Sequence, residues 1–411
     1  MKPRDYQIDI ANKAADIIRK HGLVYLAMQV RCGKTATALL TAQNLVTKKV
    51  LFVTKKKVID GILADHKALN LSFDIAVTNY EQLHNLSYVP DLIIVDEAHC
   101  LGQIPKPAKK VKILKDIWKG KPIIYLSGTP TPENYSQLFH QLHISSFSPF
   151  KDYVNFYKWA ADFVDIKQKY FKGLRVNDYT NANQQKIKQM TDHLFISFTQ
   201  EQAGFKQSIE EIVVSVPMQA STYHLADKLK KDRVYTGKDK NVILADTAAA
   251  LLTKLHQIYS GSVIDESGEG IIFDRSKVYY IKEHFKGQKI AIFYKYKAEY
   301  TMLVLTFGYN RLTSDPAKFN ESNDLIFVSQ ITSGREGINL STADALVMLN
   351  IDFSAVSYWQ ARARLQSKDR EDAAKVYWLF AQSGIEERIY NVVKGKRDYT
   401  LSYFKEDFEI E

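Results

Sequence analysis

Short apolar runs that alternate with helical patterns restrict the fold of this chain more than any other feature. Five runs occur in the first third, at residues 23–28, 50–54, 73–77, 92–95 and 123–126, and four more at residues 290–294, 325–329, 345–349 and 376–380. Runs of this length separated by helices indicate the strands of a parallel sheet that is buried on both faces. The sequence therefore predicts an α/β fold with two similar halves.

The boundaries of these halves follow from changes in composition. Ile8, Ala11, Ala15 and Ile18 recur at helical spacing before Gly22, so we expect an N-terminal helix that buries this face. Residues 148–213 are rich in Lys, Gln, Asn and aromatic residues and contain no strand-like run. We therefore predict lobes at residues 1–147 and 214–411, joined by a mostly helical connector at 148–213. Residues 262–273 are typical of a hairpin or loop.

Aromatic residues in the connector leave two interpretations open. They are Tyr153, Phe156, Tyr157, Trp159 and Phe163. Aromatic side chains can stack on nucleic-acid bases. Their spacing also fits an amphipathic helix, and we favour packing in a core.

The bulk composition narrows the class of protein. Lys and Arg number 56 against 46 Asp and Glu, a net charge of +10, which suits either a polyanionic partner or an ordinary basic surface. No apolar run is long enough to span a bilayer, so we expect no membrane association. The two cysteines, Cys32 and Cys100, do not indicate a disulfide framework, and we expect a cytoplasmic protein.

A phosphate-binding loop is predicted after the first apolar run. Gly33-Lys34-Thr35 lies between that run and a helical stretch. In such a loop the backbone N–H groups at the helix N-terminus contact phosphate oxygens, Lys34 reaches the outer phosphates, and the Thr35 hydroxyl binds Mg²⁺. The motif is degenerate, because Met28 stands where the first glycine is expected.

Two carboxylates at the end of the fourth apolar run complete this site. Asp96 and Glu97 open the sequence Asp-Glu-Ala-His. Asp96 can hold Mg²⁺ through water, and Glu97 can orient and deprotonate an attacking water. A GTPase would need a guanine-reading Asn-Lys-x-Asp sequence, which the chain lacks. We therefore predict a phosphate- and Mg²⁺-binding site that is not of the GTPase kind.

Together with further motifs in the expected order, these residues resemble the superfamily-two helicases, with their DEAH box. The motifs are residues 4–7, 52–55, 78–81, 127–130, 333–340 and 360–364. The ending of the fifth motif, Ser276-Lys277 and residues 384–389 are similar to the Swi/Snf-like branch. The absence of long insertions is typical of the minimal members that bacteriophages carry, so we expect a bacterial or phage-infected cell as the setting.

This resemblance implies two RecA-like domains that clamp one ATP, and it implies roles for individual residues. The expected catalytic residues are Lys34, Glu97, Gln360 and Arg364. The expected nucleotide-binding residues are Gln7, Arg31, Gly33, Lys34, Thr35 and Gly337, with Thr35 and Asp96 at Mg²⁺. His99, Ser127 and Thr129 are expected to couple the ATP site to DNA. Thr54, Lys55, Asn79, Tyr80 and Thr332 are expected to contact nucleic acid.

Three positions depart from the family pattern. Arg31 and Arg335 stand where glycine is usual. The sixth motif normally carries two arginines, of which Arg364 matches the first, while Ser367 stands at the position of the second. Arg362 could supply the missing charge, and the sequence leaves that open.

The predicted function is an ATP-dependent helicase or translocase on DNA, whether single-stranded, duplex or branched. Further partners would be replication, recombination or nuclease proteins. Two alternatives remain at this point. One is the motor subunit of a restriction or nuclease complex, and the other is a DNA-binding scaffold with weak ATPase activity.

Overall fold

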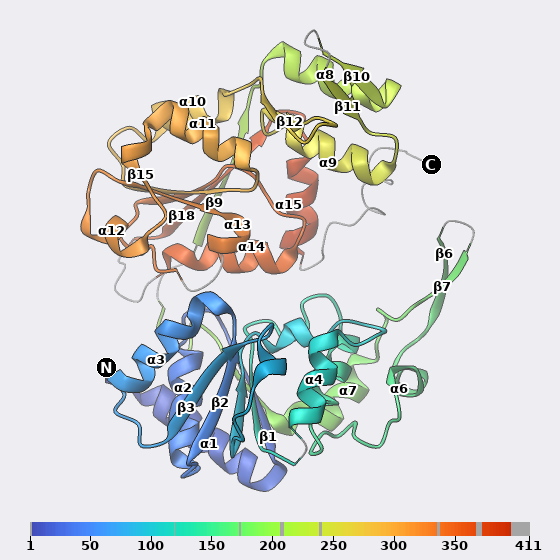
Figure 1. Cartoon of the computed structure of the whole chain (residues 1–411), viewed down its shortest axis with the longest axis vertical. Helices are drawn as coiled ribbons and strands as arrows, with labels where there is room; N and C mark the ends of the chain where they lie inside the picture. Colours follow the sequence, from blue (N-terminus) through green and yellow to red (C-terminus); the bar gives the residue numbers. More distant parts are fainter. Residues whose placement is uncertain are drawn as a thin grey trace. The chain divides into compact units, whose positions relative to one another are not determined.

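The chain folds into two compact units, Met1–Phe205 and Lys206–Glu411. The computed structural model describes residues 2–118, 120–171, 174–205, 209–237, 241–334, 338–366 and 372–395. Each unit is built on a six-stranded sheet in which every neighbouring pair is parallel. Helices cover these sheets (Figure 1). The predicted class of two tandem RecA-like α/β domains is confirmed.

The first unit orders its strands β3-β2-β4-β5-β1-β8. In chain order its elements are α1 (Asp5–His21), β1 (Leu23–Met28), α2 (Lys34–Asn44), β2 (Lys49–Thr54), α3 (Ile59–Ala68), β3 (Asp74–Asn79), β4 (Leu92–Val95), α4 (Lys109–Ile117), β5 (Ile123–Leu126), α5 (Leu138–Leu142), α6 (Phe156–Phe163), β6 (Lys167–Phe171), β7 (Leu174–Asp178), α7 (Gln184–Thr191) and β8 (Phe195–Phe198).

Alternate side chains of these strands enter two separate cores. Val24 and Leu26 of β1 pack in a core with residues of α1, α2 and α3, while Leu23 and Tyr25 pack in a core with residues of α4, α5, α6 and α7. Because both faces of the sheet are covered, both sets of side chains are apolar. This explains why the strands read as continuous apolar runs in the sequence.

The N-terminal helix forms as predicted and buries most of the predicted face. Gly22 ends α1 in the left-handed conformation, with φ 73°, and donates its N–H to the Ile18 carbonyl at 2.7 Å. Ala11, Ala15 and Ile18 are buried, whereas Ile8 in the first turn is 42% exposed. Gln7, also in the first turn, is buried instead, because it packs against the phosphate loop described below.

The second unit orders its strands β15-β16-β14-β17-β18-β9. Its elements are β9 (Ile209–Val216), α8 (Ala220–Asp232), β10 (Val234–Thr236), β11 (Val242–Leu244), α9 (Ala248–Ile258), β12 (Ser262–Ile264), β13 (Gly270–Ile272), α10 (Ser276–His284), β14 (Ile290–Tyr294), α11 (Lys297–Phe307), β15 (Leu312–Thr313), α12 (Pro316–Glu321), β16 (Ile326–Gln330), α13 (Ile331–Gly334), β17 (Ala345–Met348), α14 (Ala355–Arg362), β18 (Ala374–Ala381) and α15 (Glu386–Lys394).

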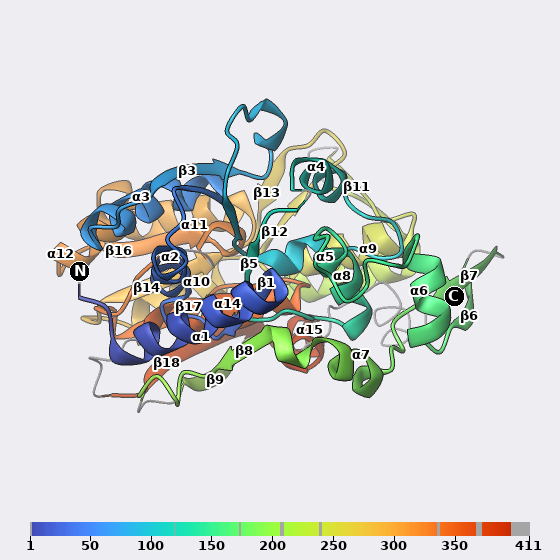
Figure 2. The same cartoon turned by 90° about the horizontal axis from the view of Figure 1, so that it is seen from below.

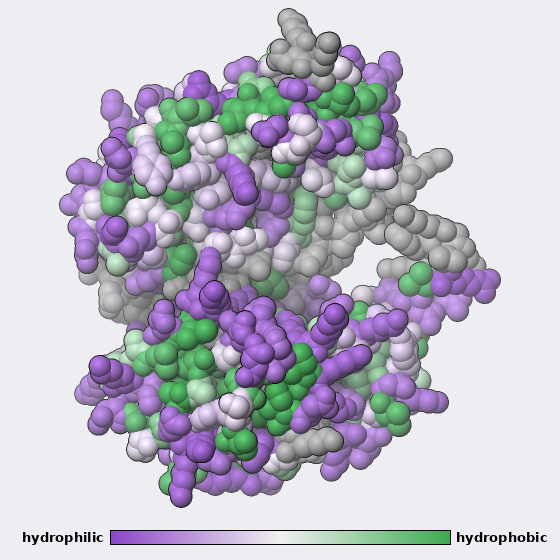
Figure 3. All heavy atoms as spheres, viewed as in Figure 1, coloured by the Kyte–Doolittle hydropathy of each residue, from purple (hydrophilic) through white to green (hydrophobic). Residues whose placement is uncertain are grey.

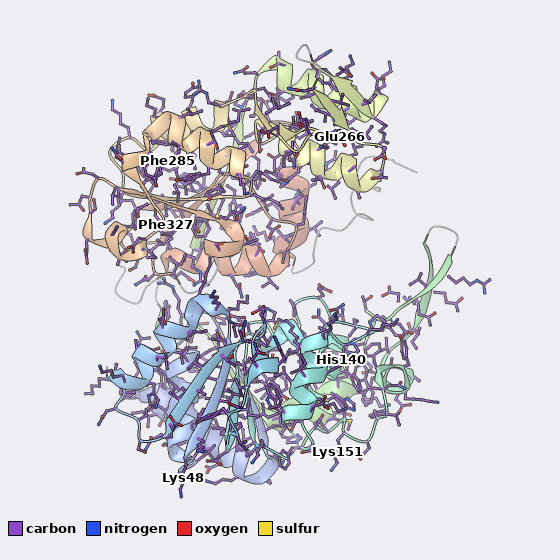
Figure 4. The ribbon with its side chains drawn as sticks, viewed as in Figure 1. Lys48, His140, Lys151, Glu266, Phe285 and Phe327 are labelled. Carbon is purple, nitrogen blue, oxygen red and sulfur yellow. The ribbon has the colours of Figure 1, made fainter. Side chains whose placement is uncertain are left out.

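This sheet is also covered on both faces. One core joins it to α8, α9, α14 and α15 and includes Phe327, which is labelled in Figure 4, and the other joins it to α10 and α11. The predicted hairpin at residues 262–273 is present as β12 and β13. Apolar side chains gather on the surface over α8, β10 and β11 (Figure 3), where Val234, Val242 and Leu244 are partly exposed.

The segment expected to be a mostly helical connector is divided between the two units. It contains α6 and α7, but β8 pairs with β1 at the edge of the first sheet, and β9 pairs with β18 at the edge of the second. Both strands lie at sheet edges, where a short or charged sequence is tolerated. For that reason β8, with four residues, and β9, with Glu210 and Glu211, lack the apolar runs of the central strands.

Between α6 and α7, β6 and β7 form an antiparallel hairpin that projects from the rest of its unit (Figures 1 and 2). The connector aromatics lie mostly in the core. Phe156, Trp159 and Phe163 are buried, as the favoured interpretation predicts, while Tyr157 is 46% exposed. Among the described residues, no helix combines the length and the apolar character needed to cross a bilayer.

Two glycine substitutions should change stability in opposite directions. Gly22→Ala places a Cβ at φ 73° and 2.3 Å from the Phe147 ring, and we expect a loss of roughly 1–2 kcal/mol in the free energy of unfolding. Gly61→Ala lies inside α3 with no atom within 4 Å of the new Cβ, and we expect a gain of roughly 0.5–1 kcal/mol. Urea unfolding measures both, and equal effects would contradict the assignment of Gly22 as the helix cap.

Candidate nucleotide site

The predicted phosphate loop connects β1 to α2 at the carboxyl edge of the first sheet. Gly33 immediately precedes α2 with φ 77°, and Arg31 also has a left-handed backbone, with φ 66°. Glycine adopts this conformation without the steric cost that other residues bear. The structure therefore gives a reason for the glycine that the family usually has at the position of Arg31.

Gly33 is also required by its neighbour Gln7. A Cβ at Gly33 would lie 2.1 Å from the Gln7 side-chain nitrogen, which donates to the Gly33 carbonyl at 3.3 Å. The other amide atom of Gln7 accepts from the Arg4 N–H at 2.8 Å, and the Tyr6 hydroxyl donates to the Cys32 carbonyl at 3.3 Å. The start of α1 thus holds the loop in place. That Gln7 reads adenine stays a prediction.

Lys34 lies where the phosphate loop meets the Ser127–Pro130 segment. Its ammonium donates to the Met28 carbonyl at 3.1 Å. A Cβ at Gly128 would lie 3.4 Å from that carbonyl oxygen and 3.6 Å from the Lys34 Nζ. Thr35 is the second residue of α2 and is partly exposed. The first turn of α2, Lys34 and Gly128 therefore lie close together.

Asp96 and Glu97 follow β4, next to the end of β2. The Asp96 carboxylate accepts from the Thr54 hydroxyl at 2.8 Å and from the Glu97 N–H at 3.0 Å. The Tyr80 hydroxyl donates to the Asp96 carbonyl. Burial raises the pKa of Asp96 to about 6, the charge of Glu97 adds to the rise, and Lys34 opposes it. A bound cation would relieve both the burial penalty and the repulsion.

The donor set fits Mg²⁺. In nucleotide sites this ion is held by one or two carboxylates together with phosphate oxygens and water. Within the described residues no three His, Cys, Asp or Glu side chains converge into a metal cluster, so any Mg²⁺ here would take its remaining ligands from the nucleotide and water. Thr35 and Asp96 are the residues that would hold it, and that assignment stays a prediction.

His99 connects the carboxylates to the Ser127–Pro130 segment. Its Nδ1 lies 2.9 Å from the Ser127 Oγ and 3.2 Å from a Glu97 carboxylate oxygen. The Ser127 Oγ in turn accepts from the Thr129 N–H at 3.1 Å. His99 thus contacts both Glu97 and Ser127, and Ser127 is hydrogen-bonded to Thr129, so a chain of contacts from Glu97 joins the three residues expected to couple the site.

Most residues expected to contact nucleic acid occupy other positions. Thr54 is 1% exposed, and its hydroxyl is used by Asp96. Asn79 is 8% exposed and accepts from two N–H groups of the following turn, and Tyr80 is buried under Lys110, whose ammonium lies 4.8 Å from the ring centroid. Thr54 and Tyr80 contact Asp96, whereas Asn79 stabilises the turn that follows β3. Lys55 is partly exposed, and Lys56, Lys57 and Thr332 are exposed on the surfaces of their units.

Sequence reasoning missed the pairing of Thr54 with Asp96, although a signal was present. The two residues end adjacent parallel strands, since Val53 pairs with Val95. The carboxyl ends of neighbouring parallel strands lie at one edge of a sheet. The positions of the two apolar runs therefore already indicated that these side chains would meet.

In the second unit the sixth-motif arginines have different environments. Arg364 is 7% exposed, and its Nε donates to the Gln360 carbonyl at 3.0 Å. Arg362 forms an ion pair with Glu211 of β9 and lies 4.5 Å from the Trp359 ring centroid. Arg362 is thus held by its own unit. Arg335, Gly337 and Ser367 lie outside the described residues.

The sequence also did not indicate that Glu211 is the ion-pair partner of Arg362. Besides Arg362, its carboxylate accepts from the Tyr358 hydroxyl at 2.7 and 2.9 Å, from the Trp378 Nε1 at 2.9 Å and from the Tyr390 hydroxyl at 3.3 Å. These donors come from α14, β18 and α15, far from Glu211 in the sequence. No local pattern could have shown that they converge.

The pKa of Asp96 gives a test of this geometry. Because its pKa is raised from 3.8 to about 6 in the folded state, the folded protein holds that proton more tightly than the unfolded chain. We expect wild type to lose stability relative to Asp96→Asn as the pH rises from about 4 to about 6, and the difference to stay constant above that. Urea unfolding of both proteins across this range measures it. A gain in the stability of wild type relative to Asp96→Asn over this pH range would contradict the raised pKa of Asp96.

Comparison with known proteins matches residues 29–260, more than half of the chain, to the model of the SNF2-related domain. The chain is 22% identical over 381 residues to the CHD3-type chromatin-remodeling factor PICKLE of Arabidopsis thaliana, covering 83% of this chain and 26% of that protein. It is 23% identical over 370 residues to the CHD3-type chromatin-remodeling factor CHR7 of the same plant, covering 79% and 28%.

A third relative is chromodomain-helicase-DNA-binding protein 8 of Xenopus tropicalis, 21% identical over 362 residues, with 78% of this chain and 16% of that protein covered. The chain thus spans about a quarter of the length of the two plant relatives. The matched segment of the SNF2-related model includes the phosphate loop, both carboxylates and His99.

Proposed function

The chain belongs to the family that carries the SNF2-related domain, and on that basis we propose that it is an ATP-dependent translocase that moves along DNA. The observation that carries the proposal is the arrangement of Lys34, Asp96 and Glu97 at one sheet edge. Through His99, Glu97 is linked to Ser127. DNA as the track is supported by the names of the relatives, which include chromatin-remodelling and DNA-binding proteins, and by the net charge of +10.

Each residue of the site has a chemical task in this proposal. The N–H groups of the first turn of α2 and the Lys34 ammonium bind phosphate oxygens. The Glu97 carboxylate orients a water molecule for attack on the outer phosphate and takes its proton. Bound Mg²⁺, held by Thr35 and Asp96, would neutralise charge on the phosphates. Gln7 and Tyr6 keep the loop in the shape that this binding needs.

The contacts from Glu97 through His99 and Ser127 to Thr129 support coupling between ATP hydrolysis and movement along DNA. A change in the charge or position of Glu97 during hydrolysis reaches His99 at 3.2 Å and Ser127 one contact further on. Ser127 holds the Thr129 N–H, so the segment that follows β5 responds to the state of the nucleotide. The resemblance to the superfamily-two helicases makes Arg364 the expected catalytic arginine, and arginines of this kind contribute roughly 10³–10⁵ in rate.

ATPase rates with different nucleic acids test the proposal. We expect phosphate release to rise with duplex DNA and to rise less with single-stranded DNA or RNA at the same salt concentration. Stimulation by single strands alone would indicate a helicase instead. Glu97→Gln and Lys34→Ala are the controls, because the first should bind ATP with little hydrolysis and the second should lose turnover. If no nucleic acid stimulates phosphate release, the scaffold interpretation replaces the motor.

Substitution of the two arginines of the sixth motif should have different effects, one on ATP turnover and the other on the free energy of unfolding. We expect Arg364→Ala to lower ATP turnover by at least about 10³ with ATP binding retained. Arg362→Ala should instead lower the free energy of unfolding by about 1–3 kcal/mol, because the Glu211 carboxylate loses its cation and keeps only its hydroxyl and indole donors. Turnover per folded molecule should stay close to wild type.

A second substitution controls for this stability effect. Glu211→Gln in the Arg362→Ala background removes the unpaired charge, and we expect it to restore much of the lost stability. ATPase assays and urea unfolding of the single and double variants provide the comparison. Loss of turnover in the stable double variant would show that Arg362 is the second catalytic arginine after all.

A further inference from the structure

A small hollow on the first unit, outside the nucleotide site, has a wall of lysines and an apolar floor. It lies between the loop at Pro105–Pro107, helix α4, helix α5 and the start of α6, and its volume is about 260 Å³. None of its lining residues belongs to the phosphate loop, to the carboxylate pair or to the chain of contacts that leads to Thr129. It is therefore a separate feature of this unit.

The floor is built from the aromatic core of the unit. Val111 of α4, Phe139 of α5 and Phe156 of α6 are buried at the base, with 5%, 1% and 2% exposed. At the rim, Val154 is 86% and Tyr157 is 46% exposed. Exposed apolar side chains next to a hollow rimmed by polar residues are typical of sites where another protein binds.

The charge around the hollow has one sign. Lys106, Lys112 and Lys115 line it, and among its described lining residues there is no aspartate or glutamate. Lys112 and Lys115 lie three residues apart on α4, so they stand on neighbouring turns of one helix face. The rim is therefore cationic over an apolar base.

Two histidines shape the walls without adding charge. His140, labelled in Figure 4, contacts the Pro105 carbonyl through Nε2 at 2.9 Å, and His143 contacts the Tyr153 carbonyl through Nε2 at 2.8 Å. Burial lowers the pKa of both imidazoles, and the charge of Lys115 lowers it further. Near neutral pH both rings are uncharged donors that fix the loop and α5, and the positive charge comes from the lysines.

The size of the hollow favours a side chain over a free small molecule. Ligand pockets typically measure roughly 300–1,000 Å³ and enclose most of their ligand. A space of about 260 Å³ that opens at the surface accommodates one or two apolar side chains. Nucleic acid is bound instead by extended cationic grooves in which aromatic faces are open for stacking. Here Phe139 and Phe156 lie buried at the base.

We propose that this hollow binds an acidic segment of a partner protein. An aromatic or aliphatic side chain of the segment inserts against Val111, Phe139 and Phe156. Carboxylates on either side of that anchor pair with Lys106, Lys112 and Lys115. Charge complementarity directs the encounter, and the buried anchor supplies most of the affinity. The surface would attach the motor to another protein without use of the nucleotide site.

The test measures binding of a fluorescein-labelled peptide, EDEDFEDLE, to the full chain by fluorescence anisotropy. We expect saturable binding of one peptide per chain. We expect at least about tenfold weaker binding of EDEDSEDSE, which has the same charge and no apolar anchor. If the two peptides bind equally, simple charge attraction explains the result and the proposal is overturned.

Matched variants locate the site. Lys112→Glu should weaken binding about tenfold, whereas Lys109→Glu, the same change at an exposed lysine of α4 that does not line the hollow, should have less than about a twofold effect. Tyr157→Asp should also weaken binding about tenfold. Tyr157 lies in the first turn of α6, where an acidic residue is compatible with the helix. Equal effects of Lys112→Glu and Lys109→Glu would contradict the site.

Two further measurements distinguish this surface from the motor. DNA-stimulated ATP turnover of Lys112→Glu should equal that of wild type, since Lys112 has no contact with the nucleotide site. An unlabelled single-stranded oligonucleotide should fail to displace the peptide at physiological salt. Displacement that depends on Lys112 would show that the hollow is a nucleic-acid site and would overturn the proposal.

Discussion

The partly buried carboxylate of Asp96 is the constraint on which the carboxyl edge of the first sheet depends. A buried charge is costly unless hydrogen bonds or a cation satisfy it. The Thr54 hydroxyl and the Glu97 N–H each donate to the Asp96 carboxylate, and Tyr80 holds the Asp96 carbonyl. These donors come from the end of β2, from the turn after β4 and from the residue after β3. Asp96 therefore joins the ends of three adjacent strands. Its raised pKa shows that the carboxylate is not fully stabilised, and a bound cation would stabilise its charged form.

The neighbouring segments are arranged around that group at the same edge of the sheet. His99 joins Glu97 to Ser127 after β5, and Gly128 lies against Met28 and Lys34 at the start of the phosphate loop. Carboxyl ends of parallel strands meet at one edge, so a short contact can join segments that are far apart in the chain. The absence of a side chain at Gly33 permits the close approach of Gln7, because a Cβ at Gly33 would collide with it.

The second unit relies on ion pairs in a comparable way. Lys277 of α10 and Glu386 of α15 are fully buried and lie 2.6 Å apart, and Glu211 of β9 pairs with Arg362 of α14. A buried pair adds little net stability compared with apolar residues, but the loss of one partner is severely destabilising. These two pairs therefore specify that α10 packs against α15 and that β9 packs against α14. They also determine that Arg362 serves the fold of its own unit.

The sequence by itself determined the two α/β halves, most central strands, the phosphate loop and the carboxylate pair, because each is encoded by a local pattern. Both-face burial requires continuous apolar runs, and phosphate binding requires Gly-Lys-Thr at a helix start. Only the tertiary structure decided that β8 and β9 complete the sheets and that Arg362 pairs with Glu211. These features depend on contacts between segments that are far apart in the sequence. Hydrophobic periodicity indicates only the local structure and the buried face of each segment, so it cannot predict such contacts.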